Sequence, residues 1–223
     1  MPFSLDPLKD EISKVEVLEV MGSDLTVINA ARVSLGKHHT EFDESDEKLI
    51  KYLAAHRHWT PFGHPQIQLR IKMPIFVARE WYRHTVGLIR NELSRRYVDT
   101  LPEFYMPQVW RTRPDKGIKQ GSGGKHPQSD RWAHIIADIT QEVSSIYIQM
   151  LDEGIAPEMA RMVLPQSMYT EFYETGSLAA YARICGLRIA PDAQQETRRY
   201  AEAVSELIAP YFEHSWAALN AHT

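Results

Sequence analysis

Cysteine is almost absent from this 223-residue chain, because Cys185 is the only one. A single thiol excludes an internal disulfide framework and any zinc site built from several cysteines. Long apolar stretches are also missing, since no run approaches the roughly 20 residues of a membrane-spanning helix. The first residues, MPFSLDPLKDEISK, lack the basic start and apolar stretch of a secretory signal. We therefore expect a cytoplasmic protein without a membrane partner.

An excess of positive charge is missing as well. The chain has 25 basic and 29 acidic residues, so its formal net charge at pH 7 is −4. Proteins that bind nucleic acid usually carry a basic surplus, and we therefore expect no nucleic-acid partner. Hydrophobic residues make up 43% and charged residues 24%, which is the balance of a globular chain with a buried core.

Periodic hydrophobic residues predict strands and helices that are interspersed along the chain. Apolar residues that alternate or cluster predict strands at 15–20, 66–73 and 167–174. Apolar residues at helical spacing predict helices at 23–34, 45–57, 74–84, 132–150, 157–164, 177–187 and 192–208. Because this order lacks a regular strand–helix–strand rhythm, we expect an α+β fold. It would be a single domain over residues 1–223, with a mostly antiparallel sheet flanked by helices.

Glycine, proline and polar residues dominate RTRPDKGIKQGSGGKHPQS, residues 111–129. This composition predicts a mobile surface loop within the domain. Its GSGGKH stretch is not a P-loop, because the spacing differs and His126 stands where serine or threonine would bind magnesium.

Arginine is concentrated in RHTVGLIRNELSRRY, residues 83–97. Guanidinium groups match phosphate oxygens, and Asn91 and Ser94 add neutral hydrogen-bonding groups. Two interpretations stay open, namely a site for a phosphate-bearing ligand and a solvated basic turn in which Glu92 pairs with an arginine. The position of the stretch directly after an apolar helix favours the first.

Three histidines in HRHWTPFGH raise the alternative of a metal-dependent phosphohydrolase that uses His56, His58 and His64. Carboxylates are sparse nearby, and no His-x-x-x-His pair with a catalytic glutamate occurs. Histidines near a helix end also serve as plain hydrogen-bonding groups, so we expect no metal site.

Three polar residues in or next to the predicted helices have an ordinary structural interpretation, and for two of them a functional one is also open. Arg161 either extends its stem to water or clamps an anion. Arg188 ends an apolar helix, where its charge suits the helix dipole. Gln194 is either an ordinary first-turn residue or an amide that reads a base or flavin edge.

Several of these segments recur in an order that resembles the flavin-dependent thymidylate synthase family. The family signature is RHRxxSxNExSxRY, and it is matched here by Arg83, His84, Asn91, Glu92, Ser94, Arg96 and Tyr97. The flanking phrases also resemble the family: AARVS (30–34), TPFGH (60–64), PIFVAREW (74–81), ARMVLP (160–165), YTEFY (169–173) and GLR with Gln194. The resemblance covers nearly the whole chain.

The resemblance implies reductive methylation of dUMP to dTMP. Methylenetetrahydrofolate would supply the carbon, FAD would be the redox cofactor and NADPH the reductant. It also implies a homotetramer whose active sites are shared between subunits. A classical cysteine-based synthase is disfavoured, because Cys185 lacks that family's Pro-Cys-His context and falls on the apolar face of its predicted helix.

The resemblance also implies residue roles. Arg188 matches the arginine thought to favour the ionised uracil ring, so we expect it to be catalytic. The residues implied for dUMP are Glu80, Trp81, Tyr82, Arg83, Glu92, Leu93, Ser94, Arg95, Arg96 and Arg161. Those implied for FAD are Ser34, His58, Thr60, Arg83, His84, Thr85, Asn91, Glu92, Ser177, Arg183 and Gln194.

The chain departs from the family pattern at several positions. Thr85 replaces an arginine, one extra residue precedes Asn91, and Glu80 stands where glutamine is usual. Arg90 and Arg183 are additional, and we expect them to replace part of the lost positive charge. These changes keep two alternatives open: a flavin-dependent pyrimidine deoxynucleotide hydroxymethylase on the same scaffold, and a non-catalytic nucleotide-binding protein.

Overall fold

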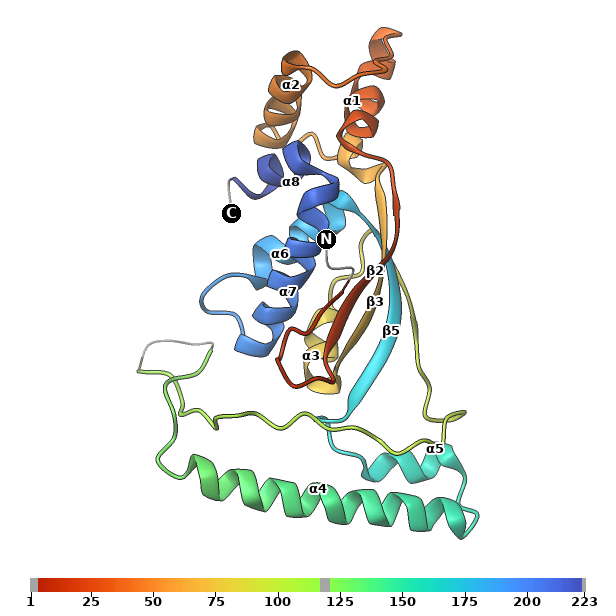
Figure 1. The fold of residues 1–223 in the computed structure, drawn as a ribbon, viewed down its shortest axis with the longest axis vertical. Coiled ribbons are helices and arrows are strands. Elements are labelled where there is room, and N and C mark those ends of the chain that lie inside the picture. The colour runs from red at the N-terminus through yellow and green to blue at the C-terminus, as the bar shows by residue number, and fades with distance from the viewer. Residues whose placement is uncertain (1–3, 117–120, 222–223) are drawn as a thin grey trace.

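A five-stranded antiparallel sheet forms the centre of this computed structural model, which describes residues 4–116 and 121–221 (Figure 1). The strands are β1 (Ser4–Leu5), β2 (Lys14–Met21), β3 (Gln66–Pro74), β4 (Leu88–Glu92) and β5 (Tyr169–Ser177). They lie in the order β1-β2-β3-β5-β4, and each neighbouring pair is antiparallel.

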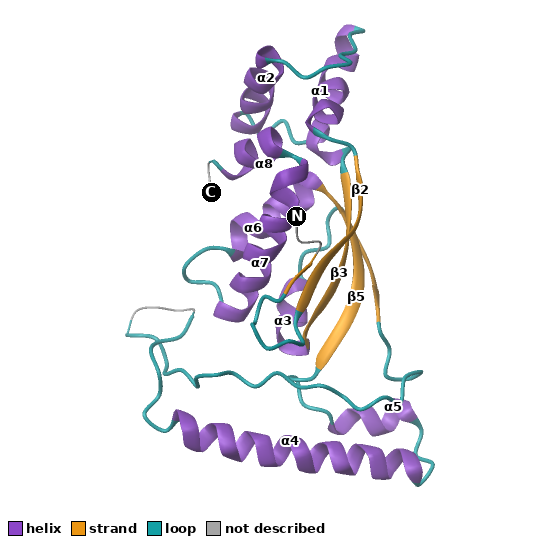
Figure 2. Cartoon of the chain, in the orientation of Figure 1, coloured by secondary structure: helices purple, strands orange, loops and turns teal. Residues whose placement is uncertain are grey.

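Helices surround the sheet unevenly. Within the described residues they are α1 (Asp24–Arg32), α2 (Glu44–Ala55), α3 (Ile75–Trp81), α4 (Ser129–Asp152), α5 (Pro157–Ala160), α6 (Leu178–Arg188), α7 (Gln195–Ile208) and α8 (Glu213–Asn220). Helices α3, α6 and α7 lie on one side of the sheet, α1, α2 and α8 lie toward one end, and α4 and α5 lie beyond the other end (Figure 2). The expected α+β fold with a helix-flanked antiparallel sheet is confirmed.

The alternating sequence of β3 explains which face of the sheet is covered. Ile67, Leu69 and Ile71 are at most 1% exposed and join a core built with the helices. The residues between them are polar and lie on the other face, where Arg70 makes an ion pair with Glu171 of β5. A period of two thus separates a buried apolar face from a polar one.

Most predicted elements occur within a few residues of their expected bounds, and the differences have local causes. Pro74 ends β3 and is the N-cap of α3, so the predicted helix 74–84 is shortened to Ile75–Trp81. The predicted helix 192–208 begins at Gln195, because Gln194 is the N-cap of α7. The predicted strand 167–174 begins at Tyr169 and continues to Ser177, where the side chain caps α6 by accepting from Ala180 N at 3.2 Å.

Strand β4 and helix α8 were not predicted from the sequence. Strand β4 has no clear alternation because Arg90 points inward, where its guanidinium pairs with the fully buried carboxylate of Glu174 on β5. Residues Arg90 and Glu174 are also directly opposite each other in the ladder. Because this inward position holds an arginine, the alternation of apolar residues does not predict the strand.

The predicted loop 111–129 is partly structured in the described residues. Arg111 and Lys125 form a β-bridge, and a Cβ added to Gly123 would lie 2.3 Å from Thr112 Oγ1. Glycine is therefore required for the close approach of the two arms. Arg111 Nη2 also makes an ion pair with the buried Glu196 of α7. Residues 117–120 at the loop's centre lie outside the described residues, so its predicted mobility stays a prediction.

Among the described residues, no helix combines the length and the apolar character that a bilayer crossing requires.

Candidate active site

The end of β4 opens into a cavity of about 460 Å³, which we call the arginine cavity. It is lined by Glu92, Leu93, Ser94, Arg95, Arg96, Arg161 and neighbouring apolar residues. Leu93 N donates to Glu171 O at 2.8 Å, so the chain stays paired with β5 at the cavity's edge. Three guanidinium groups from segments more than 60 residues apart in sequence therefore meet at one concave surface.

The three arginines of this cavity are not equivalent. Arg95 is only 8% exposed, and its Nη1 donates to Thr100 O, which fixes the turn after the strand. Arg96 and Arg161 are exposed, and Arg96 Nε donates to Ser94 Oγ at 3.3 Å. Glu92 is oriented by Thr170, whose Oγ1 donates to its Oε1 at 2.6 Å. Arg96, Arg161 and Ser94 are thus the groups available to an anion.

A second cavity of about 570 Å³ lies where α3, α6 and α7 converge, and we call it the Arg188 cavity. Its lining includes Glu80, Arg83, His84, Leu187, Arg188, Asp192 and Ala193. Arg188 Nε donates to His84 Nε2 at 2.9 Å, and Arg188 Nη1 makes an ion pair with Glu80 Oε1. Thr197 of α7 donates from Oγ1 to Glu80 Oε2 at 2.9 Å. The guanidinium is therefore held on two sides, by Glu80 of α3 and by His84 of the turn that follows α3.

His84 has an environment that keeps its ring neutral. Burial lowers the pKa of His84 to about 4, and the positive charges of Arg188, Arg183 and Arg90 act in the same direction. A neutral imidazole can accept a hydrogen bond at Nε2, and Nε2 is the atom to which Arg188 Nε donates. The geometry and the electrostatics of this contact agree.

A third, more apolar cavity of about 590 Å³ lies between α2, α6 and α8, and we call it the Trp59 cavity. Trp59 contributes the exposed apolar surface above the buried Phe62, and Arg57, His58 and Arg183 contribute polar groups. The guanidinium of Arg183 donates from Nη2 to Val86 O, which ties α6 to the segment before β4. An aromatic wall with nearby cations suits a planar ligand that carries negative charge.

The structure distributes the predicted site residues over these cavities and the surfaces between them. Trp81 is fully buried in the core, where its Nε1 donates to Glu174, and Tyr82 is half-buried against Phe172. Gln194 donates from Nε2 to Glu196 at 3.1 Å. The remaining predicted flavin contacts, Ser34, Thr60, Thr85 and Asn91, are exposed. Arg90 pairs with Glu174, so its charge is compensated inside the fold.

His56, His58 and His64, the histidines weighed as the alternative metal site, do not form a ligand cluster in the described part of the chain. His56 Nδ1 lies 2.9 Å from Tyr52 O, at the end of α2. Within the described residues, such a cluster is formed instead by His39, Asp43 and Asp46. Their potential metal-ligand atoms all lie within 4.8 Å of one another. The geometry therefore does not support a phosphohydrolase built on His56, His58 and His64.

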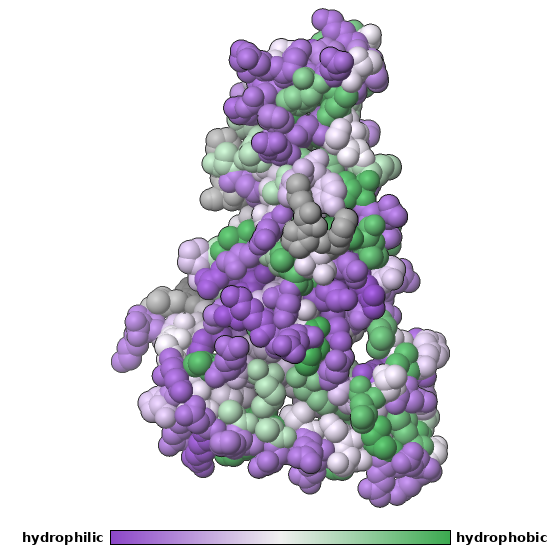
Figure 3. Space-filling view, in the orientation of Figure 1, coloured by the Kyte–Doolittle hydropathy of each residue, from purple (hydrophilic) through white to green (hydrophobic). Residues whose placement is uncertain are grey.

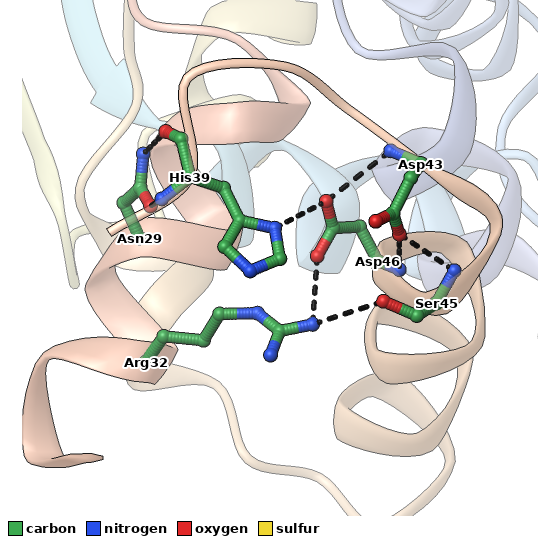
Figure 4. A network of polar contacts seen from close by, with 6 residues as sticks. All are labelled: Asn29, Arg32, His39, Asp43, Ser45 and Asp46. Carbon is green, nitrogen blue, oxygen red and sulfur yellow. Dashed lines mark hydrogen bonds and ion pairs between the residues drawn. The ribbon is translucent and has the colours of Figure 1, made fainter. Parts of the chain in front are cut away.

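The cluster at Asp46 is a hydrogen-bonded brace between α1 and α2 (Figure 4). The fully buried Asp46 carboxylate lies 2.8 Å from Arg32 Nη2 and 3.0 Å from His39 Nδ1. Asp43 accepts from Ser45 N at 2.7 Å as the N-cap of α2. Since a guanidinium already occupies the carboxylate, a second cation there would be repelled. The brace fixes the loop that follows Ser34.

Cys185 lies in the core on α6 and is 0% exposed. Burial, with a smaller contribution from Glu174, raises the pKa of its thiol far above the usual range. A protonated, inaccessible thiol cannot act as a nucleophile. The expected buried position of Cys185 is confirmed.

Comparison with known proteins gives a consistent result. The family profile described as "Thymidylate synthase complementing protein" matches residues 16–212. A flavin-dependent thymidylate synthase of Thermus thermophilus is 39% identical over 208 residues, which cover 93% of this chain and 76% of the relative. The enzyme of the same name from Kosmotoga olearia is 40% identical over 196 residues, covering 87% and 84%. This chain belongs to the flavin-dependent thymidylate synthase family.

A solved structure agrees with the family assignment. The UMP/dUMP methylase PolB from Streptomyces cacaoi, bound with 5-Br dUMP, superposes with a TM-score of 0.84 at 30% identity. The match covers 93% of this chain and 94% of PolB. A second PolB structure, bound with 5-Br UMP, gives a TM-score of 0.82. The likeness therefore covers most of both chains.

The sequence did not reveal two residues of α7 that hold charged side chains in place. Thr197 and Glu196 occupy the first turn of α7, and each anchors one charged partner, Glu80 and Arg111 respectively. In the sequence QQETRRY they look like ordinary helix residues. Their roles depend on contacts across more than 80 residues of sequence, which no local pattern reveals.

Proposed function

We propose that this enzyme methylates dUMP to dTMP, with methylenetetrahydrofolate as carbon donor, FAD as redox cofactor and NADPH as reductant. Family membership and the likeness to a UMP/dUMP methylase support the substrate class. The observation that carries the proposal is Arg188, whose guanidinium is fixed on the wall of a cavity by His84 and Glu80. A fixed cation beside a uracil ring favours the ring's ionised form.

The arginine cavity is the proposed binding site of the nucleotide phosphate. Arg96 and Arg161 can each offer several N–H donors to phosphate oxygens, and Ser94 adds a hydroxyl. Glu92 is held by Thr170 and can accept from a nucleoside hydroxyl or ring NH. Arg83 lies in the Arg188 cavity. The family resemblance also implies dUMP contacts from the segment from Trp81 to Tyr82, in which the Trp81 side chain is buried in the core.

The residues of the Trp59 cavity fit a flavin. Trp59, which is 65% exposed, gives an apolar surface for a planar ring, and Arg57 and Arg183 can offset the charge of its phosphates. A bound flavin would supply the hydride chemistry. We assign His58, Arg183, Ser177, His84 and Gln194 to its surroundings, together with the exposed Ser34, Thr60, Thr85 and Asn91.

The arrangement also supports a homotetramer with shared active sites. The proposed phosphate and ring residues line separate cavities of one chain, with the phosphate residues beside β4 and α5 and the ring residues at the ends of α3 and α6. The 24-residue helix α4 leaves apolar side chains uncovered, with Trp132 41% and Ile139 47% exposed. Hydrophobic surface also gathers around α5, where Met162 is 72% exposed (Figure 3). Copies of the chain can cover these surfaces and bring complementary cavities together.

The deciding experiment incubates the purified protein with dUMP, methylenetetrahydrofolate, NADPH and FAD and measures the mass of the nucleotide product. The proposal predicts dTMP that depends on both flavin and NADPH. A hydroxymethylated nucleotide would identify the hydroxymethylase instead, and no product despite nucleotide binding would indicate a binding protein. A parallel reaction with UMP tests whether the ribonucleotide is also accepted.

Oligomeric state is tested by light scattering on the same preparation. The proposal predicts four copies of the 25.7 kDa chain in one particle. A monomer at micromolar concentration would contradict the shared-site arrangement.

A further inference from the structure

Three helix termini meet at Arg188. Side chains from this region make hydrogen bonds with two of the three guanidinium nitrogens and leave the third without one. Glu80 and His84 come from the end of α3 and the turn after it, where His84 N donates to Trp81 O at 3.1 Å. Arg188 is the last residue of α6, and Thr197 lies in the first turn of α7. Nε and Nη1 have partners, whereas Nη2 makes no hydrogen bond within the described residues.

Glu80 is itself held by two partners. Its Oε1 faces Arg188 Nη1, and its Oε2 accepts from Thr197 Oγ1 at 2.9 Å. The side chain of Glu80 is 22% exposed and that of Arg188 is 18% exposed, so both are partly withdrawn from water. Because both oxygens are occupied, Glu80 is poorly placed to activate a water molecule. Its contacts suit the orientation of a neighbour.

His84 holds the Arg188 guanidinium through a second nitrogen, Nε. A guanidinium N–H can only donate, so the contact at 2.9 Å requires a lone pair on His84 Nε2. The ring must then be neutral and carry its proton on Nδ1. The charges of Arg188, Arg183, Arg90 and Glu80 act on the pKa of this ring, and the three arginines among them disfavour a second proton.

We infer that Glu80 and His84 are positioning residues for Arg188: together they hold Nη1 and Nε so that the free Nη2 edge faces the cavity, with His84 as the Nδ1–H tautomer and Glu80 anchored by Thr197. This inference rests on the proposed function for its catalytic consequence. The hydrogen bonds among Glu80, His84, Arg188 and Thr197 do not depend on which reaction the protein catalyses. Fixing a donor within a fraction of an ångström matters because small misplacement at a reacting group is costly in rate.

The tautomer is measured directly, without any reaction. Histidine ¹⁵N chemical shifts and one-bond N–H couplings of the holoprotein at pH 7 identify which ring nitrogen bears the proton, and His84→Gln assigns the signal. We expect a protonated Nδ1 and a bare Nε2 on His84. A proton on Nε2, or a cationic ring at pH 7, would overturn the inference because Arg188 Nε could not donate to it.

Kinetics of matched variants test the positioning role. Glu80→Ala removes the acceptor and is expected to lower kcat roughly 10- to 100-fold while the KM for dUMP changes little. Glu80→Gln keeps an acceptor oxygen for Nη1 and is expected to restore kcat to within about threefold of wild type. Thr197→Val keeps the side-chain volume but loses the anchor, and we expect a fall of about two- to fivefold in kcat. Glu202→Ala, on an exposed position of α7, is the control and should match wild type.

The outcomes separate the inference from the proposed function. An active wild type whose Glu80→Ala variant has normal kcat would overturn the inference and leave the function intact. A Glu80→Gln variant as slow as Glu80→Ala would also overturn it, because charge rather than a held hydrogen bond would then be required. If the wild type makes no methylated nucleotide, the proposed function fails and the ¹⁵N result alone decides the geometry. Should Glu80→Ala fold poorly by thermal unfolding, Thr197→Val carries the kinetic test.

Discussion

Replacing Arg90 by methionine should destabilise the fold strongly, because it leaves a buried carboxylate without its counter-ion. Glu174 is 0% exposed, and the Arg90 side chain that pairs with it is 14% exposed. The substitution removes the ion pair between Arg90 and the Glu174 carboxylate, which then keeps the hydrogen bond that Trp81 Nε1 donates at 3.2 Å. Breaking a buried pair from one side costs about 3–5 kcal/mol in the free energy of unfolding. In a chain of this size each kcal/mol lowers Tm by roughly 2–4 °C.

The pH dependence of this loss follows from Glu174. Burial raises the pKa of Glu174, and Arg90 opposes that increase. A raised pKa in the fold means that the free energy of unfolding is greatest below the ordinary carboxyl pKa and falls as pH rises through the folded value. Without Arg90 the folded pKa rises further. The deficit of Arg90→Met relative to wild type should therefore be smaller at pH 5 than at pH 7.

The assay is urea unfolding of flavin-free protein at both pH values. The double variant Arg90→Met with Glu174→Gln is the control, and it should recover a large part of the loss because no charge stays buried. A loss below about 1 kcal/mol that is equal at pH 5 and pH 7 would refute the view that this pair fastens β4 to β5.

The remaining predictions concern Cys185 in the core and Arg188 and His84 in the Arg188 cavity. Cys185→Ala should keep flavin- and NADPH-dependent product formation and cost about 1 kcal/mol of stability in urea unfolding, whereas loss of all turnover in a folded variant that binds dUMP would make the thiol the nucleophile. Arg188→Ala should lower kcat roughly 10²- to 10³-fold in the product assay, and near-normal turnover would mean that another group activates the ring. His84, with a pKa lowered to about 4 from 6.5, should make the wild type less stable as pH falls from 6.5 toward 4. His84→Gln should lack that part of the pH dependence of the urea midpoint, and an unchanged slope would contradict the neutral ring.

The chain's local patterns were sufficient for much of the fold. The alternation in 66–73 identified β3 and its buried face, and apolar spacing identified α4, α6 and α7. These features follow from side-chain periodicity, which is a property of neighbouring residues. The signature residues around 83–97 also identified the family, because their order is specific. Strand β4 escaped detection, since Arg90 becomes acceptable inside only when Glu174 lies opposite it.

By itself, then, the sequence determined the fold class, the buried state of Cys185 and the family to which the chain belongs. Only the tertiary structure decided how the charged residues pair. Glu80 and Arg188 are 108 residues apart, and Glu80 and Thr197 are 117 apart, yet they share one set of hydrogen bonds. Ion pairs and hydrogen bonds act over a few ångströms and are specified by the packing of whole helices. The sequence could therefore name Arg188, but its orientation and its partners depend on where α3, α6 and α7 meet.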